Sequence, residues 1–140
     1  MNQPQPSARI PAFLLVLLAL YCAASLVHFA HNAEFVADYP NLPAWLTRSK
    51  VYLAWFAVTS VGVAGVILLR LRLRVIGLLF IAGYALLGFA GLDHYRIAPF
   101  AAHSWAMHAT IGFEVASAAV LLLVTILVLF RPVRRSLAGA

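Results

Sequence analysis

The sequence has little charge and very few acidic residues. Charged residues make up 10% of the 140 residues, and only four residues are Asp or Glu, whereas an ordinary soluble domain carries about 25% charged residues. So small a polar fraction cannot cover the surface of a water-soluble sphere of this size, which excludes a soluble globular domain. It also excludes an intrinsically disordered chain, because disorder requires low hydrophobicity and high net charge.

Cysteine is almost absent as well. The single cysteine, Cys22, lies inside an apolar run, which excludes an intrachain disulfide, a cysteine-based zinc cluster and a CxxC redox pair. Ten Lys and Arg against four acids give a net charge of +6. In a soluble protein this charge would point to nucleic acid, but here the basic residues flank apolar runs, so we expect no nucleic-acid partner.

Long apolar runs dominate what is present. Hydrophobic residues make up 64% of the chain, and the mean hydropathy is +0.96. Each of four runs approaches the ~20 residues that a helix needs to cross a ~30 Å hydrocarbon layer, and helices satisfy their own backbone groups in lipid. We therefore predict an all-α integral membrane protein, an up-down-up-down four-helix bundle forming a single domain over residues 1–140. The predicted spans are 10–29, 51–69, 75–92 and 105–130, the first being a retained helix because it lacks a good signal cleavage site.

Basic residues mark one side of the predicted bundle. Seven of the ten Lys and Arg lie in the two tails and in the turn around residues 70–74, and short loops rich in Lys and Arg stay in the cytoplasm. We therefore predict cytoplasmic termini and a bacterial-type inner (plasma) membrane location, with loops 30–50 and 93–103 outside. The seven residues are Arg9, Arg70, Arg72, Arg74, Arg131, Arg134 and Arg135.

Two local signals agree with the helix assignment. Thr47 or Ser49 is expected to cap the second helix and Ser104 the fourth, because their hydroxyls can accept from free backbone amides of the first turn. Small residues inside the spans let helices approach closely. The candidates for such close packing are Gly62, Gly65, Gly83, Gly88, Gly91 and Gly112.

All five histidines and all four acids lie in the outer half of the predicted bundle. With a helix rise of ~1.5 Å per residue, His28 lies ~27 Å, His94 ~29 Å and His108 ~33 Å from the cytoplasmic ends of their spans. Neighbouring helices in a bundle lie ~10 Å apart, so imidazoles at one level can meet. The first helix adds an HxxH pair, His28 and His31, with Glu34 three residues on. It also carries one polar stripe at helical spacing, consisting of Tyr21, Ser25, His28 and Asn32.

Glu114 is the sharpest candidate for function. It lies ten residues past the expected cap of the fourth helix, inside the hydrocarbon zone, where a carboxylate costs at least ~2.5 kcal/mol. It must therefore be protonated, paired or bound to a cation. The structural alternative is a neutral Glu114 that bonds to Thr110 or to a tyrosine or asparagine of another helix.

These residues favour an outward-facing metal site. The predicted metal ligands are His28, His31, His94 and His108. Glu114 or Glu34 would be the catalytic base on a metal-bound water, and nitrogen and carboxylate ligands suit a divalent transition metal such as Zn or Fe. The site would act on a membrane-soluble substrate or handle the metal itself, and the sequence does not decide whether the protein is an enzyme.

Three other functions stay open at this point. One is a b-type haem protein that exchanges electrons with quinone, with His28 or His94 opposite His108 and Arg96 binding a haem propionate. Another is a proton-coupled carrier that titrates Glu114, and the third is a non-catalytic accessory subunit. The expected partners are the lipid bilayer and, as candidates, a lipophilic small molecule and a second copy of the chain.

Overall fold

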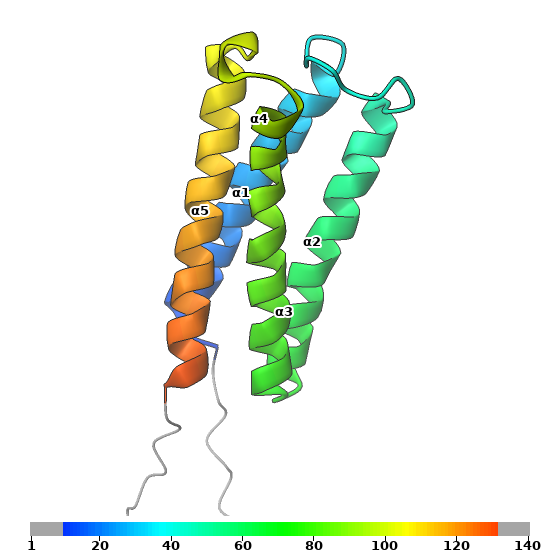
Figure 1. The fold of residues 1–140 in the computed structure, drawn as a ribbon. Coiled ribbons are helices and arrows are strands. Elements are labelled where there is room, and N and C mark those ends of the chain that lie inside the picture. Colours follow the sequence, from blue (N-terminus) through cyan, green and yellow to red (C-terminus); the bar gives the residue numbers. More distant parts are fainter. Residues whose placement is uncertain (1–9, 132–140) are drawn as a thin grey trace, which may run out of the picture.

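The computed structural model describes residues 10–131, and all regular structure in that range is helical. Four helical segments lie side by side as an elongated bundle (Figure 1). Helices α1 (Ala12–Glu34), α2 (Arg48–Arg70) and α5 (Trp105–Phe130) are three of them. The other consists of α3 (Arg74–Leu87), the 3₁₀ segment Gly88–Asp93 and the short α4 (His94–Ile97). Each segment is long and apolar enough to cross a membrane, which confirms the predicted all-helical chain with four candidate membrane spans.

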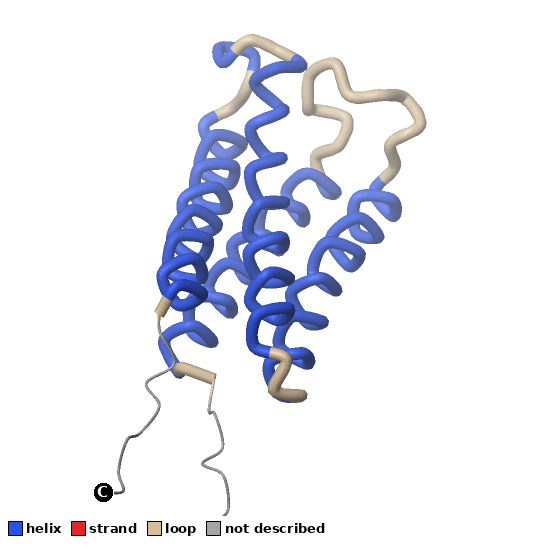
Figure 2. The backbone as a smooth tube through the Cα atoms, turned by 60° about the horizontal axis from the view of Figure 1, so that its bottom comes forward, coloured by secondary structure: helices blue, strands red, loops and turns tan. Residues whose placement is uncertain are grey.

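The two ends of the bundle differ in their connections. Figure 2 shows the long connections 35–47 and 98–104 at one end and the short turn 71–73 at the other. We call these the loop end and the turn end. Both predicted caps are confirmed at the loop end, because Thr47 Oγ1 accepts from Lys50 N at 3.4 Å and Ser104 Oγ accepts from Met107 N at 3.3 Å.

Polar residues extend three of the predicted spans, and in α2 they do so at the start, which is at Arg48 rather than at residue 51. The fourth span has the bounds predicted for it, but α1 continues five residues beyond residue 29, to Glu34. The third segment likewise runs past residue 92 to Ile97 through the 3₁₀ segment and α4. Hydropathy marks only the apolar part of a helix, so it misses the polar residues at the loop end, where Asn32 of α1 lies 3.3 Å from His94 of α4.

The outer surface of the bundle is apolar along its length. Large side chains such as Val16, Leu53 and Phe56 are 63–66% exposed, which a lipid bilayer tolerates and water does not. Inside the bundle, a hydrophobic core fills the middle and the part toward the turn end. That core comprises Leu14, Tyr21, Leu78, Ile81, Tyr84, Ala85, Ala118, Leu121 and Val128.

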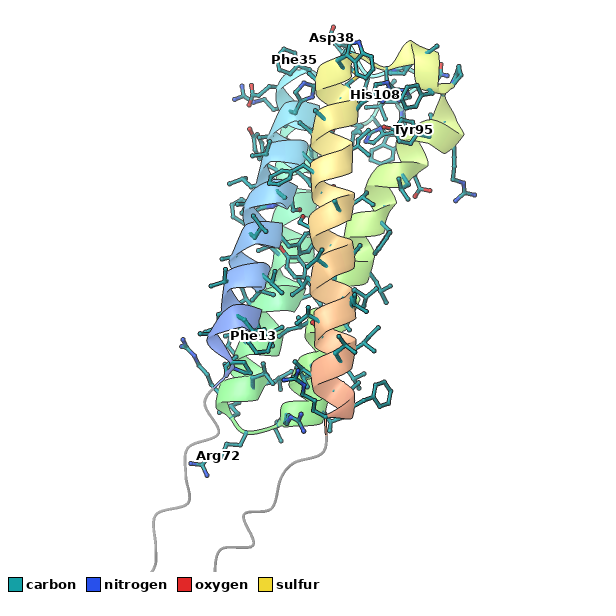
Figure 3. The ribbon with its side chains drawn as sticks, turned by 90° about the vertical axis from the view of Figure 1, so that its left-hand side faces the viewer. Phe13, Phe35, Asp38, Arg72, Tyr95 and His108 are labelled. Atoms are coloured by element: carbon teal, nitrogen blue, oxygen red, sulfur yellow. The ribbon has the colours of Figure 1, made fainter. Side chains whose placement is uncertain are left out.

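Arginines gather at the turn end. Arg74 donates to the carbonyl oxygens of Val128 at 2.6 Å and Arg131 at 3.3 Å. A cation there adds hydrogen bonds to carbonyls at the end of α5 and complements the helix dipole. Arg72 occupies the turn with a φ of 66° and extends away from the bundle (Figure 3). The predicted topology residues Arg9, Arg134 and Arg135 lie outside the described residues.

Candidate functional site

A carboxyl group and an imidazole meet inside the loop-end half of the bundle. Glu114 of α5 is 1% exposed and His28 of α1 is 2% exposed. Their Oε2 and Nε2 atoms lie 3.6 Å apart. The i, i+4 and i+7 stripe on α1 faces α5, which is why a side chain at position 28 reaches α5 rather than lipid. The predicted neighbourhood of His28 and Glu114 is thus present in the structure.

Asn32 joins this pair to a second imidazole. Its amide nitrogen lies 3.1 Å from His28 Nε2 and 3.3 Å from Nε2 of His94 on α4. An amide nitrogen has two hydrogens to donate, so both imidazole nitrogens act as acceptors. The rings of His28 and His94 are 5.5 Å apart between centroids. Three helical segments therefore contribute to one buried polar cluster, which consists of His28, Asn32, His94, Thr110 and Glu114.

The hydrogen-bond network assigns the tautomer of His28. Because Nε2 accepts from Asn32, the ring proton lies on Nδ1, and Nδ1 donates to Thr110 Oγ1 at 3.4 Å. Thr110 in turn donates to the carbonyl oxygen of Met107 at 3.1 Å. Both nitrogens of the neutral imidazole therefore have a hydrogen-bond partner. A protonated Glu114 would compete with Asn32 as the donor to the Nε2 lone pair.

The 3₁₀ segment brings backbone close to the pair. A Cβ added at Gly91 would lie 3.2 Å from Glu114 Oε2 and 3.7 Å from His28 Nε2. A 3₁₀ stretch inside a longer helix often marks a functional position, and this one occurs beside the buried carboxyl. Glycine at position 91 therefore leaves room for the carboxyl group against the third segment.

The other two predicted metal ligands have different partners. His31 Nδ1 lies 2.8 Å from the Tyr39 hydroxyl. His108 Nδ1 lies 2.9 Å from the Tyr95 hydroxyl, and Figure 3 shows these two side chains together at the loop end. His108 precedes Glu114 by six residues, which places it ~9 Å nearer the loop end. The structure thus does not gather all four imidazoles at one centre.

No metal centre is formed by the residues described. In residues 10–131, no group of three or more His, Cys, Asp or Glu side chains is arranged to hold a metal ion. Asn32 occupies the space between the two imidazole nitrogens that come closest to such a site. The role of His28, His31, His94 and His108 as metal ligands stays a prediction.

Glu34 and Arg96 lie outside the buried cluster. Glu34 Oε1 accepts from Arg48 at 2.7 Å and from the Tyr52 hydroxyl at 2.8 Å, which ties the end of α1 to the start of α2. Arg96 bonds Asp93 at 3.1 Å, and its side chain is 84% exposed. The catalytic role of Glu34 and the haem-binding role of Arg96 stay predictions.

Sequence reasoning missed the bridging role of Asn32 and the position of Tyr39. The polar stripe on the first helix did contain Asn32, and its periodicity was the available signal. Tyr39 comes from the 35–47 connection, where no periodicity exists to place a side chain. Its ring nevertheless packs against His94, with centroids 4.9 Å apart.

Tyr39 gives the loop end an expected pH dependence. It is 4% exposed, and burial raises its pKa from 10.0 to about 12. The folded protein then holds this proton more tightly than the unfolded chain, so the stabilisation is complete below pH 10 and is lost as pH rises through 12. We expect the unfolding free energy of wild type to fall by roughly 2–3 kcal/mol more than that of Tyr39→Phe over this range. Chemical unfolding followed by circular dichroism at several pH values tests it, and parallel curves for the two proteins would contradict it.

Comparisons of the chain with protein-family models, with curated protein sequences and with solved structures gave no match. Function therefore has to be inferred from the side chains of the site.

Proposed function

We propose that this is a proton-binding multi-pass membrane protein in which Glu114 and His28 share one proton inside the bilayer. The observation that carries the proposal is the 3.6 Å separation of Glu114 Oε2 and His28 Nε2, with both side chains buried. An ionised carboxylate and an imidazole lone pair are both acceptors, and a buried charge without a partner is costly. One proton on either atom turns the contact into a donor–acceptor pair, so the two groups act as one proton site.

We propose the up-down-up-down topology with both termini in the cytoplasm and the loop end outside. The bias of Lys and Arg toward one side supports it, since Arg70, Arg72, Arg74 and Arg131 all lie at or beside the turn end. The proton site then lies in the outer half of an inner membrane. Protons would reach it from the exterior rather than from the cytoplasm.

A row of imidazoles supports this route. His94 follows His28 through Asn32, and the ring of His103 lies 6.2 Å from that of His94 between centroids. His94 is half-buried and lies nearer the loop end than His28 does. Imidazole accepts a proton on one nitrogen and releases it from the other, which suits it to proton transfer near neutral pH.

Infrared spectroscopy of the reconstituted protein tests the proposal. The chain has four carboxylic side chains, so a single protonated carboxyl can be assigned by substitution. We expect a protonated-carboxyl C=O band that titrates with bulk pH in wild type and is missing in Glu114→Gln. His28→Gln should shift the pH at which this band titrates, because the partner of the carboxyl changes.

Glu34→Gln is the matched control for that experiment. Glu34 lies in α1 as a half-exposed carboxylate paired with Arg48, and its replacement should leave the band unchanged. A wild-type spectrum without such a band at any accessible pH would overturn the proposal. So would a band that persists in Glu114→Gln.

Metal binding is the second candidate, and one observation favours it. Two imidazole Nε2 atoms face the same point, which the Asn32 amide nitrogen occupies, and the buried Asn32 Oδ1 has no hydrogen-bond partner in the part of the chain that the structure describes. Rotation of Asn32 would let a divalent Zn or Fe ion take that point, with Glu114 as a further ligand. Elemental analysis of the same samples decides between the candidates: metal at one per chain that is lost in His94→Ala favours the metal site, and its absence favours the proton site. A haem b group with Arg96 at its propionate stays a prediction from the sequence.

A further inference from the structure

A groove opens on the lipid-facing side of the bundle, away from the Glu114 pair. It lies between α1 and α2, with Tyr84 of α3 contributing to its wall, and its volume is about 350 Å³. Ligand pockets in proteins commonly measure ~300–1,000 Å³. The residues that matter for its chemistry are Leu18, Cys22, Thr59, Gly62, Val66 and Tyr84.

Two hydroxyl groups in this groove lack hydrogen-bond partners among residues 10–131. Tyr84 is 1% exposed, yet its hydroxyl has none, and the buried Oγ1 of Thr59 has none either. Buried hydroxyls are normally bonded, and an unmet donor destabilises the fold. A buried threonine in a helix ordinarily bonds a carbonyl of its own helix, and Thr125 does so by donating to the carbonyl of Leu121 at 2.7 Å. Thr59 does not bond its own helix in this way.

The close approach of α2 and α3 keeps Tyr84 at the groove. A Cβ at Gly62 would lie 2.6 Å from Cδ1 of the Tyr84 ring. Real side chains never come so close, so only glycine at position 62 lets this ring lie against α2. The ring also packs on Tyr21, with centroids 4.6 Å apart. The hydroxyl is therefore held at the groove by packing from two sides.

The depth of these hydroxyls selects the ligand chemistry. Thr59 lies eleven residues from Arg70, and Tyr84 lies ten residues from Arg74, so both are ~15–17 Å from the turn end. That is near the middle of a ~30 Å hydrocarbon layer. Phospholipid ester oxygens stay at the interface and do not reach this depth. A partner for two mid-membrane donors must carry an accepting oxygen on an otherwise apolar body.

We propose that the groove between α1 and α2 binds a quinone-type molecule, whose ring carbonyl accepts from Tyr84 and Thr59 and whose chain lies along Leu18 and Val66. The apolar walls would hold the ring and the first part of its chain. This inference does not depend on the proton site, because no residue is common to both.

Binding of decylubiquinone to the full chain in lipid nanodiscs tests the inference. Trp55 lies one turn from Thr59 on α2, so quenching of tryptophan fluorescence reports occupancy, with empty nanodiscs as the partition blank. We expect saturable quenching by wild type and about fivefold weaker binding for Tyr84→Phe and for Thr59→Val, as expected for loss of one neutral hydrogen bond of ~1 kcal/mol. The double variant should bind more than tenfold more weakly.

Ser60→Ala is the matched control. Ser60 is the neighbour of Thr59, and its hydroxyl already donates to the carbonyl of Ala57 at 2.7 Å. The substitution should therefore leave affinity unchanged. Decylbenzene, which has no accepting oxygen, should bind wild type and the double variant alike. Thermal unfolding confirms that each variant folds. Wild-type quenching that does not saturate overturns the inference, as does a double variant that binds decylubiquinone with wild-type affinity.

Discussion

Replacement of His28 by alanine is expected to lower the unfolding free energy by about 3–5 kcal/mol. The imidazole contacts Asn32, Thr110 and Glu114, and all three partners come from inside the bundle. Its loss strands a carboxyl group and two polar side chains where neither water nor lipid can satisfy them, and each unmet group costs about 1–3 kcal/mol. Reversible unfolding in mixed micelles, followed by circular dichroism, measures the difference.

His31→Ala is the matched control for this substitution. His31 lies one turn away on the same helix and is half-buried, with the Tyr39 hydroxyl as its hydrogen-bond partner. Its loss should cost about 1 kcal/mol, the ordinary contribution of one hydrogen bond. His28→Gln should recover part of the loss, since an amide can both donate to Thr110 and accept from Asn32. Equal destabilisation by His28→Ala and His31→Ala would show that the buried cluster does not stabilise the fold as described.

The second large effect concerns Gly65, where α2 crosses α3. A Cβ there would lie 2.8 Å from Ile81 Cγ1 and 3.1 Å from the carbonyl oxygen of Gly77. A backbone oxygen cannot rotate away, so the two helices must separate. We expect Gly65→Ala to lower the unfolding free energy by about 1–3 kcal/mol, the usual range for overpacking.

Gly83→Ala gives the contrasting result. Apart from the backbone of its own helix and its chain neighbours, no heavy atom of the described residues lies within 4 Å of the position that a Cβ would take at Gly83. Alanine there meets no neighbouring atom and removes the entropic penalty of glycine in a helix. We therefore expect the unfolding free energy to rise by about 0.5–1 kcal/mol. The same micelle unfolding assay measures both variants. A Gly65→Ala protein as stable as Gly83→Ala would contradict the close crossing of α2 and α3.

These two glycines show how far composition predicts packing. The sequence marked both as candidates for close helix contact, because glycine inside a membrane span has no side chain to separate helices. Only the structure distinguishes Gly65, which faces α3, from Gly83, which faces open space. The difference depends on the rotation of each helix about its axis, and an apolar span without a strong polar face does not encode that rotation.

The site was predictable where helix geometry alone determines position. The rise per residue placed His28 and His94 at one level, and the i, i+4, i+7 stripe pointed His28 into the bundle. Both predictions agree with the contact between these rings. His108 has partners that helix rise does not place, because they come from the short helical turns at the loop end: its Nδ1 lies 2.9 Å from the Tyr95 hydroxyl, and its ring stacks on Phe100 with centroids 3.7 Å apart. A loop that folds back over a helix end has no periodicity by which a sequence could reveal it.

The tight winding of Gly88–Asp93 fixes the direction in which His94 points. Over six residues, a 3₁₀ helix turns through ~720° and rises ~12 Å, whereas an α-helix turns through ~600° and rises ~9 Å. Rewinding this stretch to α would swing His94 by ~120° around the axis of its span and draw it ~3 Å back, off the amide of Asn32. The 3₁₀ register of six residues thus determines whether the imidazole of His94 meets Asn32 at all.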